Sequence, residues 1–224
     1  PNSYREKLNY DRNANITSLI RNGGLDHEQS LFVLEIDNLV YNYSANSNKL
    51  IAVTDNSLSS EGFYDGNTSG VDFTYDVNGN MITDRNKGIT SINYNHLNLP
   101  TKIIFNNDLN TRIEYLYDAG GKKVQKKVFQ YNPPPGLAIP ISNTTDYLDG
   151  FQYKDGELKF FAHAEGYVNN TVLNGNNVYN YVFNYTDHLG NVRVSYGLNS
   201  KNVLKILEEN HYYPFGLKHT NYNS

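Results

Sequence analysis

Histidine and carboxylate side chains, which serve as metal ligands and as general acids and bases, come close together twice in this sequence. They are Asp187, His188 and His211 in one group, and His163 and Glu165 in the other. Neither group has the His-x-x-x-His or His-Glu-x-x-His spacing of a metal site. Asp187 and His188 precede Gly190 and Asn191 in a predicted hairpin, where an Asp side chain accepts hydrogen bonds from its own loop. We therefore expect structural roles for these residues and no metal ion.

The remaining reactive residue types give no support for catalysis. Ser195 lacks the Gly-x-Ser-x-Gly context of a nucleophile elbow, and the chain has no cysteine. Arg193 stands between Val192 and Val194, so on a strand it should face the opposite side and pair with an acidic neighbour; a substrate clamp is the alternative. The sequence therefore predicts no enzyme, no catalytic residue and no cofactor.

Composition indicates strands and turns and excludes two classes of partner. The chain has 20 Tyr, 10 Phe and 17 Gly beside one Met and no Trp. Tyr and Phe favour pleated sheets, and Gly adopts the positive φ angles of tight turns. A net charge of −4 without a block of basic residues argues against nucleic acid as a partner. No apolar run approaches the ~20 residues needed to span a bilayer, so we expect no membrane insertion.

One plan recurs along the chain: an aromatic or aliphatic residue, any residue, Tyr, a polar turn and a return strand. It occurs in Leu8–Thr17, Tyr41–Leu50, Phe73–Ile82, Ile92–Thr101, Tyr115–Val124 and Phe183–Val192. Alternation of apolar and polar residues on both sides of each turn predicts that every such segment is a β-hairpin. The spacing of the repeats is irregular, which argues against a propeller of equal blades. The Tyr rings could stack on sugars or on a guest chain, but cross-strand packing is the simpler role.

Prolines interrupt the pattern once. Pro133, Pro134, Pro135 and Pro140 cannot donate to a strand ladder, so residues 131–145 are expected to form a surface loop. Polar stretches predict further loops near residues 55–70 and 174–177. The segment Lys201–Glu209 contains good helix formers, but its apolar residues fit a strand pair nearly as well, and we expect a strand.

Two sets of residues resemble motifs of the Rhs/YD-repeat family. Tyr75, Asp76, Gly79 and Asn80 resemble the Tyr-Asp-x-x-Gly-Asn core of the YD repeat, and Tyr117 with Asp118 resembles it more loosely. The residues that resemble the Rhs repeat-associated core signature are Asp187, His188, Gly190, Asn191 and Arg193, followed by Tyr212, Tyr213, Pro214, Phe215 and Gly216. The segments 88–94 and 97–100 resemble the versions found in Bacteroidetes-type bacteria.

The resemblance implies an all-β spiral shell of repeated hairpins. It divides the chain into YD-repeat hairpins over residues 1–130, the Pro-rich loop at 131–145, and a Rhs repeat-associated core at 146–224 that is incomplete at its C-terminal end. Family members are secreted or cell-surface bacterial proteins, polymorphic toxins used in bacterial competition, whose shell encloses a C-terminal toxin. The expected partners are thus the rest of a longer polypeptide, the enclosed toxin or effector domain and export machinery.

The sequence also leads to expectations about self-cleavage, about the terminal strands and about an alternative function. The conserved aspartates with which family members cleave themselves are not present in this sequence, so self-cleavage is not expected of the residues in hand. The terminal strands, near Leu8–Tyr10 and Asn210–Tyr213, should be open sheet edges that would favour aggregation. An adhesion or glycan-binding β module is the alternative function.

Overall fold

The computed structural model describes residues 2–25, 33–130, 141–199 and 201–219, and within these ranges it contains strands and turns but no helix. The strands are β1 (Glu6–Tyr10), β2 (Ile16–Leu25), β3 (Val33–Tyr43), β4 (Leu50–Asp55), β5 (Phe73–Tyr75), β6 (Met81–Asp84), β7 (Ile89–Tyr94), β8 (Pro100–Phe105), β9 (Asp108–Tyr117), β10 (Lys123–Gln130), β11 (Ile141–Leu148), β12 (Phe151–Lys154), β13 (Glu157–His163), β14 (Gly166–Leu173), β15 (Asn176–Thr186), β16 (Val192–Leu198) and β17 (Leu204–Glu209). The prediction of an all-β chain of repeated hairpins is confirmed.

The strands pair in the order in which they occur in the sequence. Strands β1 to β4 form a four-stranded sheet, and β5 to β17 form a thirteen-stranded sheet. Every pairing is antiparallel, as short hairpin connections require. Between β4 and β5 the ladder is replaced by Asp72, whose backbone N–H donates to the Ile51 carbonyl at 2.8 Å and whose carboxylate accepts from the Val53 N–H at 2.8 Å.

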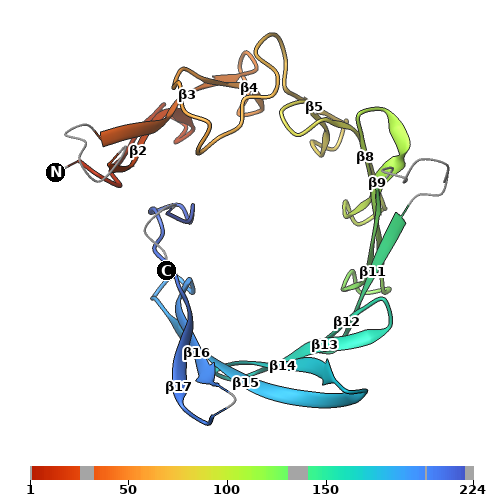
Figure 1. The fold of residues 1–224 in the computed structure, drawn as a ribbon. Coiled ribbons are helices and arrows are strands. Elements are labelled where there is room, and N and C mark those ends of the chain that lie inside the picture. Colours follow the sequence, from red (N-terminus) through yellow and green to blue (C-terminus); the bar gives the residue numbers. More distant parts are fainter. Residues whose placement is uncertain (1, 26–32, 131–140, 200, 220–224) are drawn as a thin grey trace, which may run out of the picture.

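The strip of strands bends into an open ring, so that Tyr213, after the last strand, lies against Asn22 in β2 (Figure 1). Strands twist with a fixed hand, and β-bulges increase the local bend. Most of the hairpins contain such a register shift next to their turn, for example between Thr74 and Tyr75 and between Asn93 and Tyr94. Repeated bulges beside the turns of most hairpins thus provide a physical reason for the curvature.

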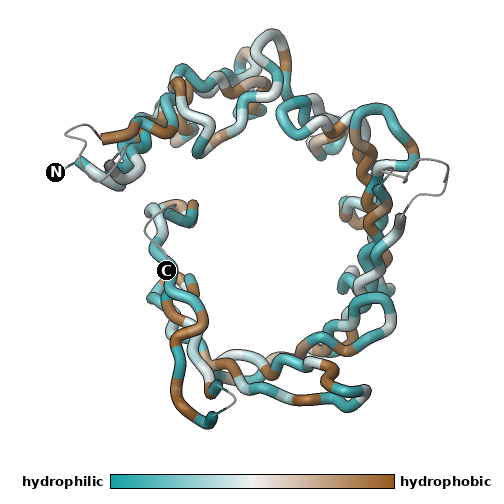
Figure 2. The backbone as a smooth tube through the Cα atoms, viewed as in Figure 1, coloured by the Kyte–Doolittle hydropathy of each residue, from teal (hydrophilic) through white to brown (hydrophobic). Residues whose placement is uncertain are grey.

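A cluster of buried apolar side chains lies near the start of the ring, while Val168 in β14 and Val182 in β15 are buried apart from it. Leu19, Leu39, Val53 and Phe73 form a cluster that joins the four-stranded sheet to the start of the long sheet, with Tyr41, Tyr75 and Met81 packed against it. Elsewhere hydrophobic and hydrophilic residues are interleaved along the tube (Figure 2). The ring is therefore mostly a single layer of sheet, with both faces short of cover.

The loop predictions meet different outcomes. Residues 141–145 belong to strand β11, which pairs with β10 from Ile141↔Gln130 to Asp146↔Gln125. The prediction of a Pro-rich loop over 131–145 is therefore wrong for its last five residues. Residues 131–140 lie outside the described residues. The prediction of a strand within Lys201–Glu209 is confirmed by β17. The loop predicted near 55–70 is confirmed except at Asp55, which ends β4. The loop predicted at 174–177 is shorter, because Asn176 and Asn177 pair with Leu173 and Val172 in the β14–β15 hairpin and only Asn174 and Gly175, with φ angles of 51° and 78°, form its turn.

No helix among the described residues is long and apolar enough to cross a membrane.

Candidate functional site

The YD motif at Asp76 is a closed loop of hydrogen bonds. Asp76 Oδ1 accepts from the backbone N–H groups of Asn78 at 2.9 Å and Asn80 at 2.8 Å, and its Oδ2 accepts from Asn80 Nδ2 at 2.9 Å. The Gly79 N–H donates to the Asp76 carbonyl at 3.1 Å, and Gly79 has a φ of 86°. This is a type I turn followed by a left-handed residue, which places a bulge beside the turn. The residues that carry the motif therefore specify a turn, and Gly79 is present because its φ disfavours any side chain.

The same loop recurs at Asp11, Asn95, Asp118, Asp187 and Asn199, whose side-chain oxygens each accept from the backbone N–H groups two and four residues later. The residue three positions on has a positive φ each time, and it is Ala14, Asn98, Gly121, Gly190 or Asn202. We call these loops the Asx turns. The turn at Asn199 was missed by the sequence analysis, since no aromatic-x-Tyr precedes it.

Hydrogen bonding in these loops fixes the charge of their carboxylates. The side-chain amides of Asn15, Asn80 and Asn191 are the main reason that the pKa values of Asp11, Asp76 and Asp187 lie below the ordinary value. Because these carboxylates stay ionised and spend their lone pairs inside their own loops, they have little capacity left to bind a metal or move a proton.

In four of the six repeats, and again at Tyr212, the Tyr reaches back to the preceding hairpin. Its hydroxyl donates to the backbone carbonyl of the first residue of the return strand in that hairpin. The pairs are Tyr43 to Ile16 at 2.8 Å, Tyr75 to Leu50 at 2.7 Å, Tyr94 to Met81 at 2.5 Å, Tyr117 to Pro100 at 2.8 Å and Tyr212 to Val192 at 3.0 Å. Partial burial raises the pKa of Tyr94 and of Tyr117, which keeps both hydroxyls protonated as donors. The Tyr residues thus hold neighbouring hairpins together, as the cross-strand interpretation favoured, and the acceptors could not be read from the sequence.

Asx turns also contact the loops of neighbouring hairpins. Asn48 Oδ1 accepts from Asn15 Nδ2 at 2.9 Å, and Asn98 Oδ1 accepts from Asn80 Nδ2 at 2.9 Å. The abundance of Asn therefore has two causes: turn geometry within a hairpin and side-chain amide bonds between hairpins.

Two residues of the signature that resembles the Rhs repeat-associated core, Asp187 and Arg193, come together with His211. Arg193 Nη1 lies 3.9 Å from Asp187 Oδ2, and its Nη2 lies 3.2 Å from Nδ1 of His211. The expected acidic neighbour of Arg193 is thus Asp187. His188 is exposed in the turn, and in the other group His163 contacts the Val182 carbonyl at 3.2 Å. Within the described ranges no group of three or more His, Cys, Asp or Glu side chains could hold a metal ion.

The segment Tyr212–Gly216 is a further turn of the same backbone form. The Tyr213 N–H donates to the Leu217 carbonyl at 2.8 Å, the Gly216 N–H donates to the Tyr213 carbonyl at 2.9 Å, and Gly216 has a φ of 84°. Tyr213 thus stands where other loops have Asp or Asn. Pro214 occupies a position whose N–H is not needed in this form, and Phe215 is 62% exposed.

Tyr213 contacts the opposite end of the chain. Its hydroxyl donates to the Asn22 carbonyl at 2.6 Å, across 191 positions in the sequence. The Arg21 guanidinium lies 5.1 Å from the Tyr213 ring centre, and the ring centre of His219 lies 4.4 Å from that of Tyr213 and 4.1 Å from that of Tyr4. Burial raises the pKa of Tyr213 to about 12. The terminal strand expected at Asn210–Tyr213 is not formed: β17 ends at Glu209, Tyr212 makes only an isolated bridge with Lys218, and Tyr213 packs on the first hairpin.

Arg21 is itself held by two buried carboxylates. Its Nε lies 2.8 Å from Glu6 Oε2 and its Nη1 lies 2.5 Å from Asp37 Oδ2, and both carboxylate side chains are fully buried. Asp37 Oδ1 also accepts from the Phe63 N–H at 2.6 Å. Nothing in the repeat pattern singled out these residues.

Strands β12 to β16 carry a face of aromatic rings. Ring centres lie 4.9 Å apart for Phe151 and Phe161, 5.6 Å for Phe183 and Tyr196, and 5.4 Å for Tyr185 and Tyr196. Tyr179, Tyr181 and Tyr185 continue this face along β15 and are 51%, 60% and 64% exposed. We call this set the aromatic face; its rings stack on one another and also remain open to a partner.

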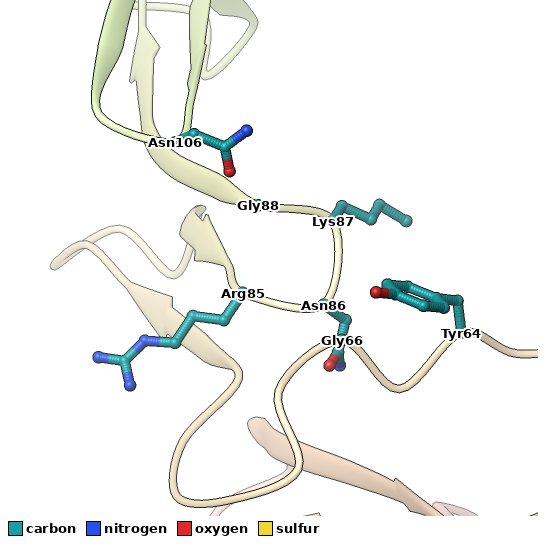
Figure 3. Close-up of a pocket in the computed structure, with 7 residues that line it drawn as sticks. All are labelled: Tyr64, Gly66, Arg85, Asn86, Lys87, Gly88 and Asn106. Atoms are coloured by element: carbon teal, nitrogen blue, oxygen red, sulfur yellow. The ribbon is translucent and has the colours of Figure 1, made fainter.

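A polar hollow of about 530 Å³ lies beside the loop that joins β6 to β7 (Figure 3). It is lined by Tyr64, Gly66, Arg85, Asn86, Lys87, Gly88 and Asn106. In Figure 3 the side chains of Lys87 and Tyr64 extend on one side of this loop and that of Arg85 on the other. Asn86 is 4% exposed, and its Nδ2 has no hydrogen-bond partner among the described residues, while its Oδ1 accepts from the Asn67 N–H at 3.0 Å.

The chain was compared with known proteins. No family model matches it, and no curated protein matches it. Among solved structures it is similar to the crystal structure of TcdB2-TccC3-TEV, with a TM-score of 0.51 and 16% identity over 96% of this chain. It is also similar to that of TcdB2-TccC3-Cdc42, with a TM-score of 0.47 and 15% identity over 96% of this chain. The first likeness supports an Rhs-like fold; the chain spans 12% of the length of either structure's matched chain.

Proposed function

We propose that this chain is part of the wall of a Rhs-type shell in a secreted or cell-surface bacterial protein of the Bacteroidetes type, and that the shell encloses a toxin or effector polypeptide. The observation that carries the proposal is the arrangement of the strands: antiparallel hairpins that follow one another in sequence order through two sheets and bend around an open centre (Figure 1). The chain covers a small part of the structure that it resembles, so the enclosed polypeptide and the rest of the wall belong to a longer protein in this proposal.

The proposed mechanism is exclusion rather than catalysis. Backbone ladders, Asx turns and Tyr hydroxyl bonds hold the wall together, and the ionisable groups of the turns are committed to those loops. The aromatic face would line the interior, where exposed rings contact apolar stretches of an unfolded guest without needing one particular sequence. The rest of the longer polypeptide, the enclosed domain and export machinery are the partners that this role requires.

Photo-crosslinking in the longer protein tests this role. A photoreactive phenylalanine analogue in place of Tyr181, on the aromatic face, should cross-link to the enclosed polypeptide. The matched control is the same analogue in place of Asn180, which is exposed on the opposite face of β15 because adjacent strand residues point in opposite directions. Mass spectrometry identifies the cross-linked segment. Equal yields from the two positions, or none from Tyr181, would contradict the proposal.

The polar hollow favours a second candidate, a glycan-binding adhesion module. Tyr64 is 77% exposed, and Lys87, whose side chain is 74% exposed, extends on the same side of the loop and supplies a charged donor (Figure 3). Titration with an acidic oligosaccharide, followed by NMR, tests this role: Tyr64→Ala and Lys87→Met should weaken binding, while Lys122→Met on a distant turn should not. An absence of binding at about 10 mM, the concentration expected to fill even a weak site, would exclude the second candidate.

A further inference from the structure

The turn at Tyr213 differs from the Asx turns in one respect that costs the loop two hydrogen bonds. In the Asp76 loop the carboxylate accepts from two backbone N–H groups, whereas a Tyr ring at the same position is too long to bend back to its own loop. The backbone bonds of the two loops are otherwise alike, at 2.9 and 3.1 Å for Asp76 and 2.8 and 2.9 Å for Tyr213. The Tyr213 side chain is therefore released from its own turn and directed elsewhere.

The surface that receives Tyr213 presents complementary groups. It consists of the Asn22 carbonyl, the Arg21 guanidinium and the Tyr4 ring, and we call it the receiving patch. Each group contacts Tyr213 or His219: the Asn22 carbonyl accepts a hydrogen bond from the Tyr213 hydroxyl, the Arg21 guanidinium faces the Tyr213 ring, and the Tyr4 ring stacks on His219. Tyr213 is only 3% exposed as a result. A buried hydroxyl with a 2.6 Å partner is a specific contact rather than incidental proximity.

The receiving patch is also held by contacts in which Tyr213 takes no part. Glu6 and Asp37 fix the Arg21 guanidinium from two sides, and Asp37 is tied to the loop at Phe63. The Tyr4 N–H donates to the Gly23 carbonyl at 2.9 Å, and the Asn22 N–H donates to the Arg5 carbonyl at 2.8 Å, so the edge that carries the acceptor is already laddered. Preorganised groups bind with less loss of conformational entropy.

We infer that the Tyr212–Gly216 turn and the receiving patch are two halves of an interface that closes this chain into a ring, and that the same patch accepts the turn of a second copy when the internal contact is lost. The two halves lie at opposite ends of one chain, so the internal contact is favoured by a high effective concentration. The interface is heterologous, because the turn and the receiving patch are different surfaces. When both surfaces belong to one chain, that chain closes into a ring; when they belong to different copies, each copy binds the next and an open-ended oligomer forms.

The distance between the two ends tests the closure. The sequence has no cysteine, so spin labels can be attached only at introduced ones, here Lys7→Cys on the first hairpin and Leu204→Cys on β17, both exposed. The closed chain should give one narrow distance distribution. Tyr213→Ala should broaden it, and light scattering after size exclusion should show oligomers that grow with concentration. Tyr213→Phe, which loses only the hydroxyl bond, should lower the closed fraction by about tenfold relative to the open one.

Tyr212→Phe is the matched control. Tyr212 is the neighbour of Tyr213 in the same turn, but its hydroxyl donates locally to Val192, so its loss should leave the distance distribution narrow and the chain monomeric. His219→Ala removes the stacked ring alone and should broaden the distribution less than Tyr213→Ala. A narrow distribution and a monomer for Tyr213→Ala would overturn the inference, and so would equal broadening by Tyr212→Phe.

Discussion

The four-stranded sheet β1–β4 and the strands β12–β17 are built from the same antiparallel hairpins, yet they bury their side chains differently. In the first region Leu19, Leu39 and Val53 are at most 4% exposed and Asp37 is fully buried. In the second region Val168 and Val182 are also buried but belong to no such cluster, and Tyr181 and Leu204 are 60% and 65% exposed. Both regions share the turns and the backbone ladder, so these features alone do not produce a core.

This contrast shows which part of the ring is stable by itself. The first region has an apolar cluster and a buried ion group that tie the segment 56–72 across its sheet, through Asp37 and the Phe63 N–H. The second region leaves the aromatic face open. A single sheet layer with an open apolar face gains stability from whatever covers that face. We therefore regard the first region as the anchor of the ring and the second as the surface for a partner.

The largest expected effect is at the buried ion group. Asp37→Ala removes the acceptor of both Arg21 and the Phe63 N–H and leaves a buried cation with one carboxylate partner, so we expect a loss of about 3–5 kcal/mol in the free energy of unfolding. Urea denaturation measures it. The control in the second region is Glu157→Ala, whose exposed pair with Lys159 should contribute roughly 0–1 kcal/mol. Similar losses at the two sites would remove the distinction between the regions.

Shortening an apolar side chain to Ala should also lower the free energy of unfolding much more in the first region than in the second. Leu39→Ala creates a cavity in the buried cluster, and we expect it to cost about 2–5 kcal/mol. Leu204→Ala changes an exposed side chain on β17 and should stay within about 0.5 kcal/mol. Thermal or urea unfolding of the two variants measures the difference. If Leu204→Ala is as costly as Leu39→Ala, the β17 side chain must be covered in solution, and the open face assigned here would be wrong.

The contact that joins the two regions should respond to alkali. The Tyr213 pKa is about 12 in the folded chain against an ordinary value of 10.0, so the unfolded chain loses the proton first as pH rises. Its contribution is fully present below pH 10.0, and it is lost as pH rises through the folded value of about 12. Unfolding measured across this window should show a steeper fall for the natural chain than for Tyr213→Phe. Parallel curves would show that Tyr213 is not buried against Arg21 and Tyr4.

The smallest effect should be common to both regions. Asp11 and Asp187 lie in Asx turns of the first and second region, and both have lowered pKa values. Their contribution to stability is present above the unfolded pKa of about 3.9 and is lost as pH falls through the lower folded values. Asp11→Asn and Asp187→Asn should each weaken the acid dependence slightly, because an amide oxygen still accepts, as at Asn95 and Asn199. A change confined to one variant would show that the turns are not equivalent.

The sequence by itself determined the local structure of this protein. Strand alternation and an Asp or Asn followed three positions later by a left-handed residue are short-range signals, so the turns at Asp76, Asp118 and Asp187 could be predicted. Ala14 shows the limit of that signal: it has a φ of 64° although its side chain disfavours positive angles, and the loop at Asp11 imposes the conformation.

Only the tertiary structure decided which hairpins touch and where charge is buried. The Tyr hydroxyls donate to backbone carbonyls, which every residue has, so no residue type marks the acceptor. Arg21, Glu6 and Asp37 meet because β1, β2 and β3 are adjacent in one sheet, and Tyr213 meets Asn22 because the curvature of the whole strip returns its end to its beginning. Such curvature is the sum of small twists and bulges over many strands, and no local pattern of residues specifies that sum.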